Sequence, residues 1–389
     1  MFHAYTGDEQ FDLQLNRFTH PELDPSVKGD LAEVIPQLRT AGDWYPCWSE
    51  LARRREVAGD HAVASGYWGA AAFYEPLDSE TKRAAVAGFR REFYAGWDGP
   101  ELERLEVPYA GSSLPALRIR TAAEHSAEPL LLFGGFDSYM EEMAGWLRAL
   151  GDCGRDVVIF DGPGQGTALM RGLAMPLAWE RPVGAVLDAL EIERCAAMGM
   201  SLGGLLVMRV AAFEPRVTRI VAMDVFYRMF DALEIRLPRT AGVALEFLVW
   251  CRASGVLDAA VSRLAARDHD MAWKLQQALA ITGTDSPHEL LYELERWSFA
   301  GLGPLVRQDV LLFAGERDQY VPLRRLGQVA RELVNANSVT TRVFTDAEHA
   351  AEHCQVGNLP LALGAVRDWL DETEERLYSV TSKSTKTAA

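Results

Sequence analysis

Hydrophobic and polar positions follow two rhythms along the chain, and the change comes near residue 101. Before it, apolar and aromatic side chains recur at helical spacing, which predicts helices over residues 46–58, 61–74 and 79–94. After it, short apolar runs alternate with helical patterns. That alternation is typical of a mostly parallel, doubly wound sheet. We therefore predict an α/β protein with a helical N-terminal region.

Eight apolar runs are candidates for the strands of this sheet. They are residues 105–109, 114–121, 129–133, 157–160, 196–199, 220–223, 310–314 and 341–344. The first two are expected to open the sheet as an antiparallel pair. Helical patterns lie between the runs, at about residues 138–150, 179–190, 202–213, 322–334 and 359–376.

The alternation of strands and helices is interrupted between the sixth and seventh predicted strands. Residues 225–305 there have a mainly helical pattern and no clear strand pattern. An insertion at the carboxyl edge of such a sheet lies where substrates enter, so we predict a cap or lid. The remaining divisions are a helical N-terminal region (1–100) and a core in two parts (101–224 and 306–377). Residues 378–389 are polar and rich in Ser, Thr and Lys, which predicts a disordered tail.

Composition narrows the class of protein. The chain of 389 residues is 49% hydrophobic and 24% charged, as in ordinary soluble globular proteins. A formal charge of −16 argues against nucleic acid or an anionic membrane as a partner. We find no signal-peptide pattern and no apolar stretch long enough to span a membrane. Five scattered cysteines without C-x-x-C spacing fit a reducing cytoplasm, where we expect the protein to be located.

Ser201 is the candidate nucleophile. It is the centre of Gly-Met-Ser-Leu-Gly (199–203), between a predicted strand and a predicted helix. A serine on such a tight turn needs small neighbours, and the turn holds its hydroxyl above the sheet at a helix N-terminus. The five-residue pattern alone occurs by chance in many chains, so the alternative is a plain Gly/Ser turn. The strand–turn–helix context favours the nucleophile.

A serine nucleophile needs a histidine to accept its proton and a carboxylate to orient that histidine. In this fold they follow the serine in the order acid, then histidine. Asp318, after the seventh predicted strand, is the expected acid, with a helix cap or a surface ion pair as its alternative role and Glu316 as the less favoured acid. His349 and His353 both follow the last strand, and their spacing does not choose between them.

The oxyanion hole is expected to combine the backbone N–H of Leu202 with one from the turn after the third strand. In that turn Gly134 and Gly135 allow the backbone to approach a substrate, and we favour the N–H of Phe136. An ordinary turn with Ser138 as helix N-cap is compatible with this role.

A second glycine-rich turn, Asp-Gly-Pro-Gly-Gln-Gly at 161–166, lacks the Lys-Ser/Thr of a phosphate-binding loop, so we interpret it as a structural turn near the active site. No cluster of His, Cys and carboxylates has metal-ligand spacing in the sequence. We therefore expect neither a metal nor another cofactor.

With these motifs placed, the chain resembles α/β-hydrolases of the FrsA-like group, in particular polyketide-shortening hydrolases of the Ayg1 type and 2,6-dihydroxypseudooxynicotine hydrolase. The resemblance covers most of the chain; its parts are the helical N-terminal region, residues 134–138, 161–166 and 199–204, Asp318, and residues 353–358 before 368–370. In such proteins the base directly precedes a cysteine, which implies His353 and leaves His349 in reserve. Two departures are Thr167, where similar proteins often carry Glu, and the cap, which matches nothing we can place.

Four carboxylates are candidates for the substrate pocket. Asp137 and Asp161 lie in the two glycine-rich turns. By resemblance, Asp231 and Glu234 are candidates for an acidic group near the substrate, although a solvated cap helix is the favoured alternative.

These observations predict a serine hydrolase that acts on a small molecule. By resemblance, its leaving group is a carbon acid, so that the bond cut is a C–C bond in a β-dicarbonyl, an acylated aromatic or a polyketide-like compound. An ester or thioester hydrolase, and a cyclase or acyltransferase, are alternatives with the same triad; a non-catalytic binding or regulatory module is the alternative outside enzymes. The aromatic-rich N-terminal region leads us to expect a homodimer.

Overall fold

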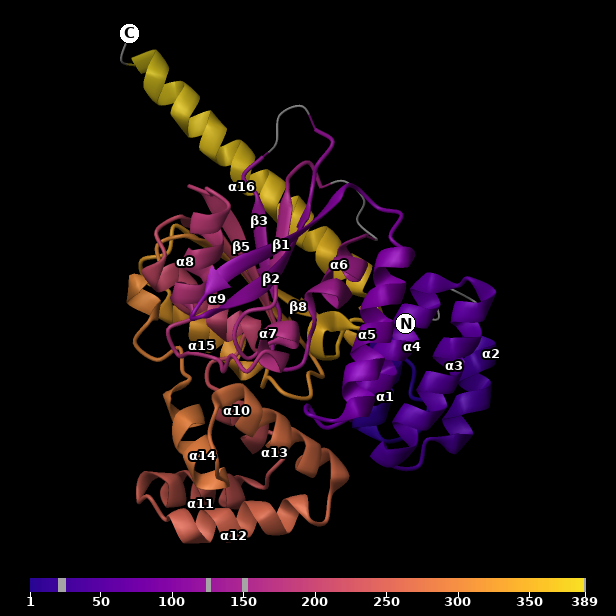
Figure 1. Ribbon diagram of the computed structural model, residues 1–389. Helices are drawn as coiled ribbons and strands as arrows, with labels where there is room; N and C mark the ends of the chain where they lie inside the picture. Colours follow the sequence, from indigo (N-terminus) through magenta and orange to yellow (C-terminus); the bar gives the residue numbers. More distant parts are fainter. Residues whose placement is uncertain (20–25, 124–126, 149–152, 388–389) are drawn as a thin grey trace. The chain divides into compact units, whose positions relative to one another are not determined.

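Two compact units make up the chain in the computed structural model, which describes residues 1–19, 26–123, 127–148 and 153–387 (Figure 1). The helical unit comprises Met1–Asp98, Pro163–Leu177 and Ala232–Trp297. The α/β unit comprises Gly99–Gly162, Ala178–Asp231 and Ser298–Ala389.

The α/β unit is built on an eight-stranded sheet in the order β1-β2-β4-β3-β5-β6-β7-β8. The strands are β1 Leu102–Tyr109, β2 Ser112–Ile119, β3 Leu130–Phe133, β4 Val157–Phe160, β5 Cys195–Met200, β6 Val217–Met223, β7 Asp309–Gly315 and β8 Ser338–Phe344. β2 pairs antiparallel with both β1 and β4, and all other pairs are parallel. The eight predicted strands, the antiparallel opening and the mostly parallel sheet are thus confirmed.

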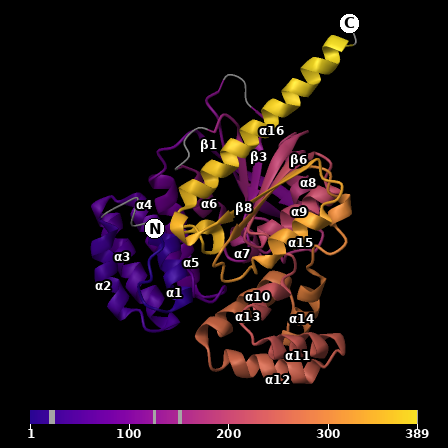
Figure 2. The ribbon, with the colours of Figure 1, turned by 180° about the vertical axis from the view of Figure 1, so that it is seen from behind.

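Helices cover both faces of this sheet. They are α6 Met140–Arg148, α8 Glu180–Ala189, α9 Gly203–Phe213, α15 Arg324–Glu332 and α16 Leu359–Thr387. The connection through α6 runs toward the β1 edge, whereas those through α8, α9 and α15 run toward β8, so right-handed crossovers put α6 on the opposite face. α16 packs on α6 and β7, and it crosses in front of the strands in Figure 2.

Helix α16 is longer than the sequence pattern predicts. It continues to Thr387 through most of the segment for which we expected disorder (378–389). After Gly364 the sequence holds no Gly or Pro that would end a helix. Residues 388–389 of the expected tail, and the last two residues of the helix expected over 138–150, lie outside the described residues.

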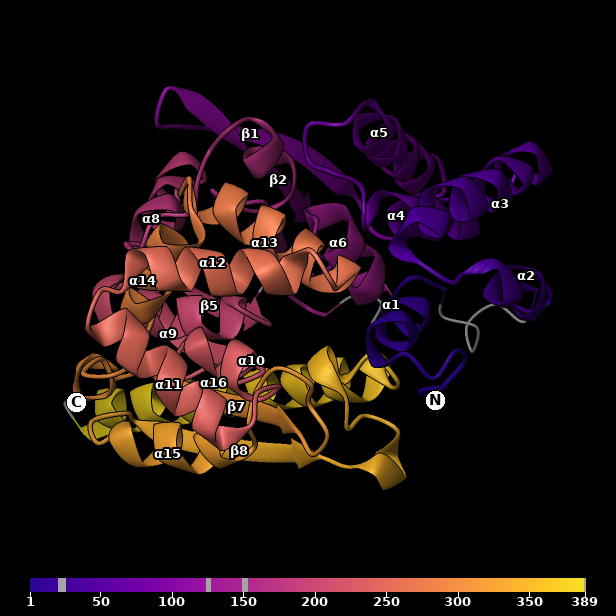
Figure 3. The ribbon, with the colours of Figure 1, turned by 90° about the horizontal axis from the view of Figure 1, so that it is seen from below.

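The helical unit joins three segments of sequence. Its helices are α1 Glu9–Thr19, α2 Val27–Val34, α3 Trp44–Ala58, α4 His61–Ala72, α5 Glu80–Ala95, α7 Gly166–Met170, α11 Arg239–Trp250, α12 Ser254–Ala265, α13 His269–Thr282 and α14 Pro287–Arg296, while α10 Phe230–Glu234 spans the boundary with the α/β unit. α11 to α14 pack on one another (Figure 3). Short 3-10 turns lie at Ile35–Gln37, Ala41–Asp43, Gly303–Leu305, Asp346–Glu348 and His353–Gln355.

Aromatic side chains form the core of the helical unit. Trp44, Trp48 and Tyr67 are fully buried, which agrees with packing rather than a ligand-binding box. The Trp273 ring of α13 lies 4.5 Å from the Phe73 ring, centroid to centroid. The N-terminal helices and the insertion, which the sequence pattern separates, therefore share one core.

Within the described ranges, no helix combines the length and the apolar composition needed to cross a bilayer.

Candidate active site

Ser201 sits on a strained turn between β5 and α9. Its φ of +58° is in the left-handed region, which a non-glycine residue rarely adopts. A Cβ on Gly199 would collide with the carbonyl of Gly203, and one on Gly203 would lie 2.6 Å from the carbonyl oxygen of Gly134. Positions 199 and 203 must therefore both be glycine. The turn between them holds a partly buried serine at the carboxyl end of β5.

A chain of hydrogen bonds joins Ser201 to a histidine and an aspartate. Nε2 of His353 lies 2.8 Å from Oγ of Ser201, and Nδ1 of His353 lies 2.9 Å from Oδ2 of Asp318. The other carboxylate oxygen of Asp318 accepts the backbone N–H groups of Tyr320 at 2.7 Å and Val321 at 2.9 Å, which fixes its orientation. With Nδ1–H donating to Asp318, Nε2 is the nitrogen that accepts a proton from the serine.

The structure separates the alternatives that the spacing left open. His349 is exposed and ends the 3-10 turn Asp346–Glu348 with a φ of +57°. Glu316 is also exposed, whereas Asp318 is buried beside His353. The residues brought together are thus Ser201, Asp318 and His353.

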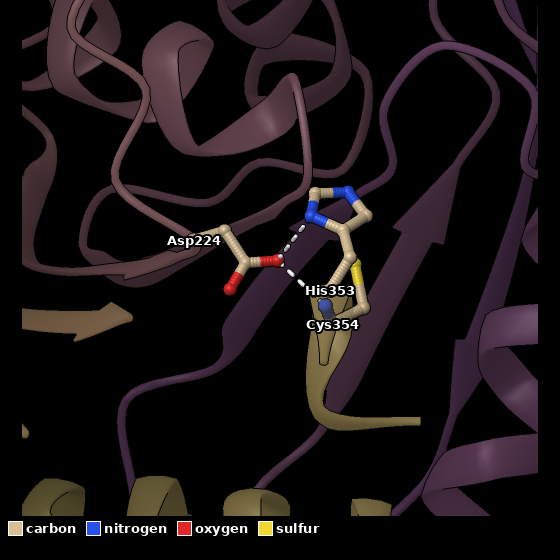
Figure 4. Close-up of side chains that lie close together, drawn as sticks. All are labelled: Asp224, His353 and Cys354. Atoms are coloured by element: carbon tan, nitrogen blue, oxygen red, sulfur yellow. Dashed lines mark hydrogen bonds and ion pairs between the residues drawn. The ribbon is translucent and has the colours of Figure 1, made fainter. Parts of the chain in front are cut away.

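A third carboxylate, for which the sequence predicted no role, lies at the same place. Asp224 is the first residue after β6, is fully buried, and has a φ of +62°. Its Oδ2 accepts the backbone N–H of Cys354 at 2.7 Å and lies 3.1 Å from Nδ1 of His353 (Figure 4). Its Oδ1 accepts Nε2–H of Gln355 at 2.8 Å. Its position directly after a predicted strand, at the edge that carries Ser201, is the signal that could have found it.

Burial and charge shift the pKa values of these groups. Burial, together with the neighbouring Asp318, raises the pKa of Asp224 to about 6, against the opposing effect of His353. Burial lowers the pKa of His353, but Asp318, Cys354 and Asp224 outweigh it, and the pKa lies well above the ordinary value of 6.5. Burial raises the pKa of Cys354 to about 11, so its thiol is uncharged at neutral pH. Asp318 and Asp224 are thus the two carboxylates that raise the pKa of His353.

The glycine-rich turn after β3 lies in close contact with Ser201. A Cβ on Gly135 would lie 2.8 Å from Cβ and 3.0 Å from Oγ of Ser201, and 2.9 Å from the backbone nitrogen of Leu202. The N–H of Gly135 donates to Oγ of Ser138 at 3.1 Å, which engages that amide within the turn. Phe136, the next amide, and Leu202 remain the predicted oxyanion donors.

Two of the four candidate pocket carboxylates, Asp161 and Asp231, are fully buried and have partners within the protein. Oδ1 of Asp161 accepts the N–H of Met140, the first residue of α6, at 2.7 Å. The fully buried Asp231 receives the Arg325 guanidinium on both oxygens, at 2.9 and 2.6 Å. Partners distant in sequence engage both carboxylates, and their expected contact with the substrate stays a prediction.

Asp137 and Glu234 stay predictions as well. Asp137 is half-buried in the turn beside Gly135, and Glu234 is half-buried in the helical unit.

The ligand atoms of Asp224, His353 and Cys354 also lie within 4.8 Å of one another, a spacing that would suit a metal ion. A metal would need a deprotonated thiol and an unprotonated Nδ1. Nδ1 instead faces Asp318 at 2.9 Å, and the Cys354 pKa of about 11 keeps the thiol protonated. The hydrogen-bonded arrangement and a metal would therefore compete for the same atoms.

Residues 128–351, more than half of the chain, match the family described as alpha/beta hydrolase fold. The chain belongs to this family. Among its relatives, hydrolase acrC of Aspergillus aculeatus is 30% identical over 70% of this chain and 74% of its own length. The 20-hydroxy-prefusarin hydrolase FUS2 of Gibberella moniliformis is 26% identical over 88% of this chain and 92% of its own. The family and its named members make this protein a hydrolase.

Solved structures show the same fold. The crystal structure of 2,6-dihydroxy-pseudo-oxynicotine hydrolase has a TM-score of 0.62 at 20% identity, covering 88% of this chain and 91% of that chain. AbyA5 has a TM-score of 0.67 at 21% identity, covering 95% and 98%. The resemblance that the sequence motifs indicated is confirmed.

Proposed function

We propose that this α/β hydrolase is a serine hydrolase that cleaves an acyl bond through a covalent acyl-enzyme. The observation that carries the proposal is the unbroken chain of hydrogen bonds from Ser201 through His353 to Asp318. A base at 2.8 Å from the hydroxyl is within the reach that proton transfer requires.

In the first half of the reaction, Oγ of Ser201 attacks the acyl carbon while its proton moves to Nε2 of His353. Asp318 stabilises the imidazolium that forms. The negative charge on the former carbonyl oxygen is held by the N–H groups of Phe136 and Leu202, with Gly135 leaving room for that oxygen.

In the second half, the tetrahedral intermediate collapses and the bond to the leaving group breaks. For a C–C substrate, the leaving carbon keeps the electron pair and receives the proton from Nε2 of His353. Water, deprotonated by the same nitrogen, then attacks the acyl-enzyme and releases the acid and Ser201.

We propose that the substrate is a β-dicarbonyl, an acylated aromatic or a polyketide-like small molecule, and that a C–C bond is cut. Support comes from the motif resemblance and from a relative whose name gives 20-hydroxy-prefusarin as its substrate. A stabilised carbanion is a leaving group that one well-placed proton donor can assist, which His353 supplies. Ester hydrolysis with the same residues is the competing chemistry.

The experiment compares wild type with Ser201→Ala and, as a matched control, Ser112→Ala on the exposed part of β2. Each is treated with a fluorophosphonate and its intact mass recorded, and turnover of p-nitrophenyl acetate and of a β-diketone is measured. We expect labelling and turnover in wild type and in the control, neither in Ser201→Ala, and faster β-diketone cleavage. Equal labelling of Ser201→Ala would refute the serine mechanism; faster ester turnover would refute C–C specificity.

Ligand retention without turnover would instead support the binding-module alternative. The same assays with a chelator present test the expectation of a cofactor-free reaction.

Homodimer formation and a cytoplasmic location stay predictions. The aromatic side chains that suggested a dimer are buried inside the helical unit, while Val243, Phe247 and Trp250 of α11 are exposed by 60%, 59% and 74%. Light scattering after size-exclusion chromatography measures the oligomeric state.

A further inference from the structure

His353 has two carboxylates on the same side of its ring. Its Nδ1–H donates to Asp318 at 2.9 Å, and Oδ2 of Asp224 lies 3.1 Å from the same nitrogen. Asp318 arrives from the loop after β7 and Asp224 from the end of β6, so the two approach the imidazole from neighbouring parallel strands. Figure 4 shows the Asp224 oxygen turned toward the ring.

Asp224 has two features that cost free energy in the folded protein. Its carboxylate is fully buried beside a second carboxylate, and its backbone has a φ of +62°. A buried carboxylate is costly to ionise, and a left-handed conformation is strained for a residue other than glycine. A neutral side chain would avoid the first cost, and glycine would avoid the second. Such local costs persist where the surrounding structure, and often the mechanism, requires them.

We propose that Asp224 is a second positioning residue for His353: its negative charge stabilises the imidazolium together with Asp318, and it accepts the hydrogen bond from Nδ1–H when Asp318 is removed. This inference rests on the proposed serine mechanism. Asp224 acts through His353 and does not touch the substrate.

The distances explain why Asp224 can replace Asp318. A triad with a single acid loses about 10⁴-fold in kcat when that aspartate becomes asparagine, because the imidazole adopts the wrong tautomer. Here a carboxylate 3.1 Å from Nδ1, within hydrogen-bond distance, remains after Asp318 is changed. The tautomer with the proton on Nδ1 is then still favoured.

Asp224 also holds residues 354 and 355 in place through hydrogen bonds. A test of its charge must leave these hydrogen bonds intact. Cys354 and Gln355 have φ values of +53° and +51°, and both donate to Asp224. Oε1 of Gln355 is buried and has no hydrogen-bond partner among the described residues. If Gln355 flips its amide, Oε1 can accept from the side-chain amide that Asp224→Asn introduces. This substitution therefore keeps the anchoring bonds and removes only the charge.

The pKa of His353 depends on the groups that surround its ring. They are Asp318, the ring of Tyr320 at 4.8 Å and the ring of Phe226 at 6.2 Å, together with Asp224, the neighbouring Cys354 and the hydroxyl of Ser201. Among the described groups, Asp224 is the only carboxylate besides Asp318 that lies in ion-pair distance of His353. Loss of the Asp224 charge is thus expected to lower the pKa of His353.

The test measures kcat, KM and the pH dependence of kcat/KM for wild type, Asp224→Asn, Asp318→Asn and the double variant, with thermal unfolding of each. For Asp224→Asn we expect an unchanged melting temperature and KM, and an acid limb moved to lower pH by about one unit. For Asp318→Asn we expect a loss of less than about 10²-fold, and for the double variant a further loss of about 10²-fold. A purely structural role would change the amplitude or the melting temperature and leave the acid limb in place.

An unmoved acid limb in a folded Asp224→Asn, or equal activity of Asp318→Asn and the double variant, would overturn the inference. If Asp318→Asn does not fold, the pH profile of Asp224→Asn decides alone. Ser201→Ala separates the two proposals: if it keeps wild-type turnover, the serine mechanism itself fails, whereas an inactive Ser201→Ala with an unmoved acid limb refutes only the role of Asp224.

Discussion

Nε2 of His353 lies 2.8 Å from the hydroxyl oxygen of Ser201, although the two residues are 152 positions apart in the sequence. The serine is on the turn after β5, and the histidine is in the loop after β8. Parallel strands present their carboxyl ends at one edge of the sheet, so residues that follow different strands meet there. The sheet edge at which Ser201 and His353 meet is therefore where changes in sequence or pH are expected to alter activity.

The pH dependence of kcat/KM follows from the charge on His353. The general base must be neutral in the free enzyme, and the pKa of His353 lies well above 6.5. Activity is therefore expected to fall as the pH drops through a value above 6.5. A profile of p-nitrophenyl acetate hydrolysis from acid to alkaline pH checks this, and full activity maintained below pH 6.5 would contradict it.

Gly135→Ala is expected to lower kcat by about 10²-fold or more, because the added methyl group would occupy the space for the oxyanion. That methyl would lie 3.0 Å from Oγ of Ser201 and 2.9 Å from the nitrogen of Leu202. Gly255→Ala is the matched control, since its Cβ would meet nothing within 4 Å. Steady-state kinetics of both variants checks the prediction, and equal kcat values would exclude Gly135 from the oxyanion site.

Asp231→Asn is expected to reduce stability rather than substrate binding. The carboxylate is fully buried against Arg325, and breaking a buried pair costs about 3–5 kcal/mol. The same change at Asp258, whose pair with His288 is partly exposed, is expected to cost less than about 1 kcal/mol. Thermal unfolding compares the two variants. A raised KM with unchanged unfolding in Asp231→Asn would contradict this prediction and support a role in the substrate pocket.

Thiol reagents are expected to distinguish Cys251 from Cys354. Cys251 is exposed, whereas Cys354 is buried beside His353 with a pKa of about 11, so little reactive thiolate forms. Ellman's reagent at mildly alkaline pH should modify Cys251 quickly, and Cys251→Ser should remove that fast phase. Cys354 should react only after denaturation. Rapid loss of activity in Cys251→Ser treated with the reagent would point to a reactive Cys354.

Local features of the sequence determined the fold and much of the site. Apolar runs and helical spacing depend on a few neighbouring residues, and they predicted the eight strands of the sheet. The sequence also indicated the nucleophile turn, because Gly199 must be glycine to avoid the carbonyl of Gly203 within the same turn. Asp318 was expected for a similar reason, since it follows a buried strand in the fold's chain order.

Tertiary structure decided what depends on sheet order and distant partners. Spacing did not choose between His349 and His353, and only the resemblance favoured the second, which the structure brings to Ser201. Asp224 gained its place at the imidazole because β6 lies between β5 and β7, an order that no local pattern records. Asp231 had a partner 94 positions away in Arg325. Hydrophobic periodicity reflects residues within one segment of the chain. The contacts that bring the site residues together form between segments that are distant in the sequence.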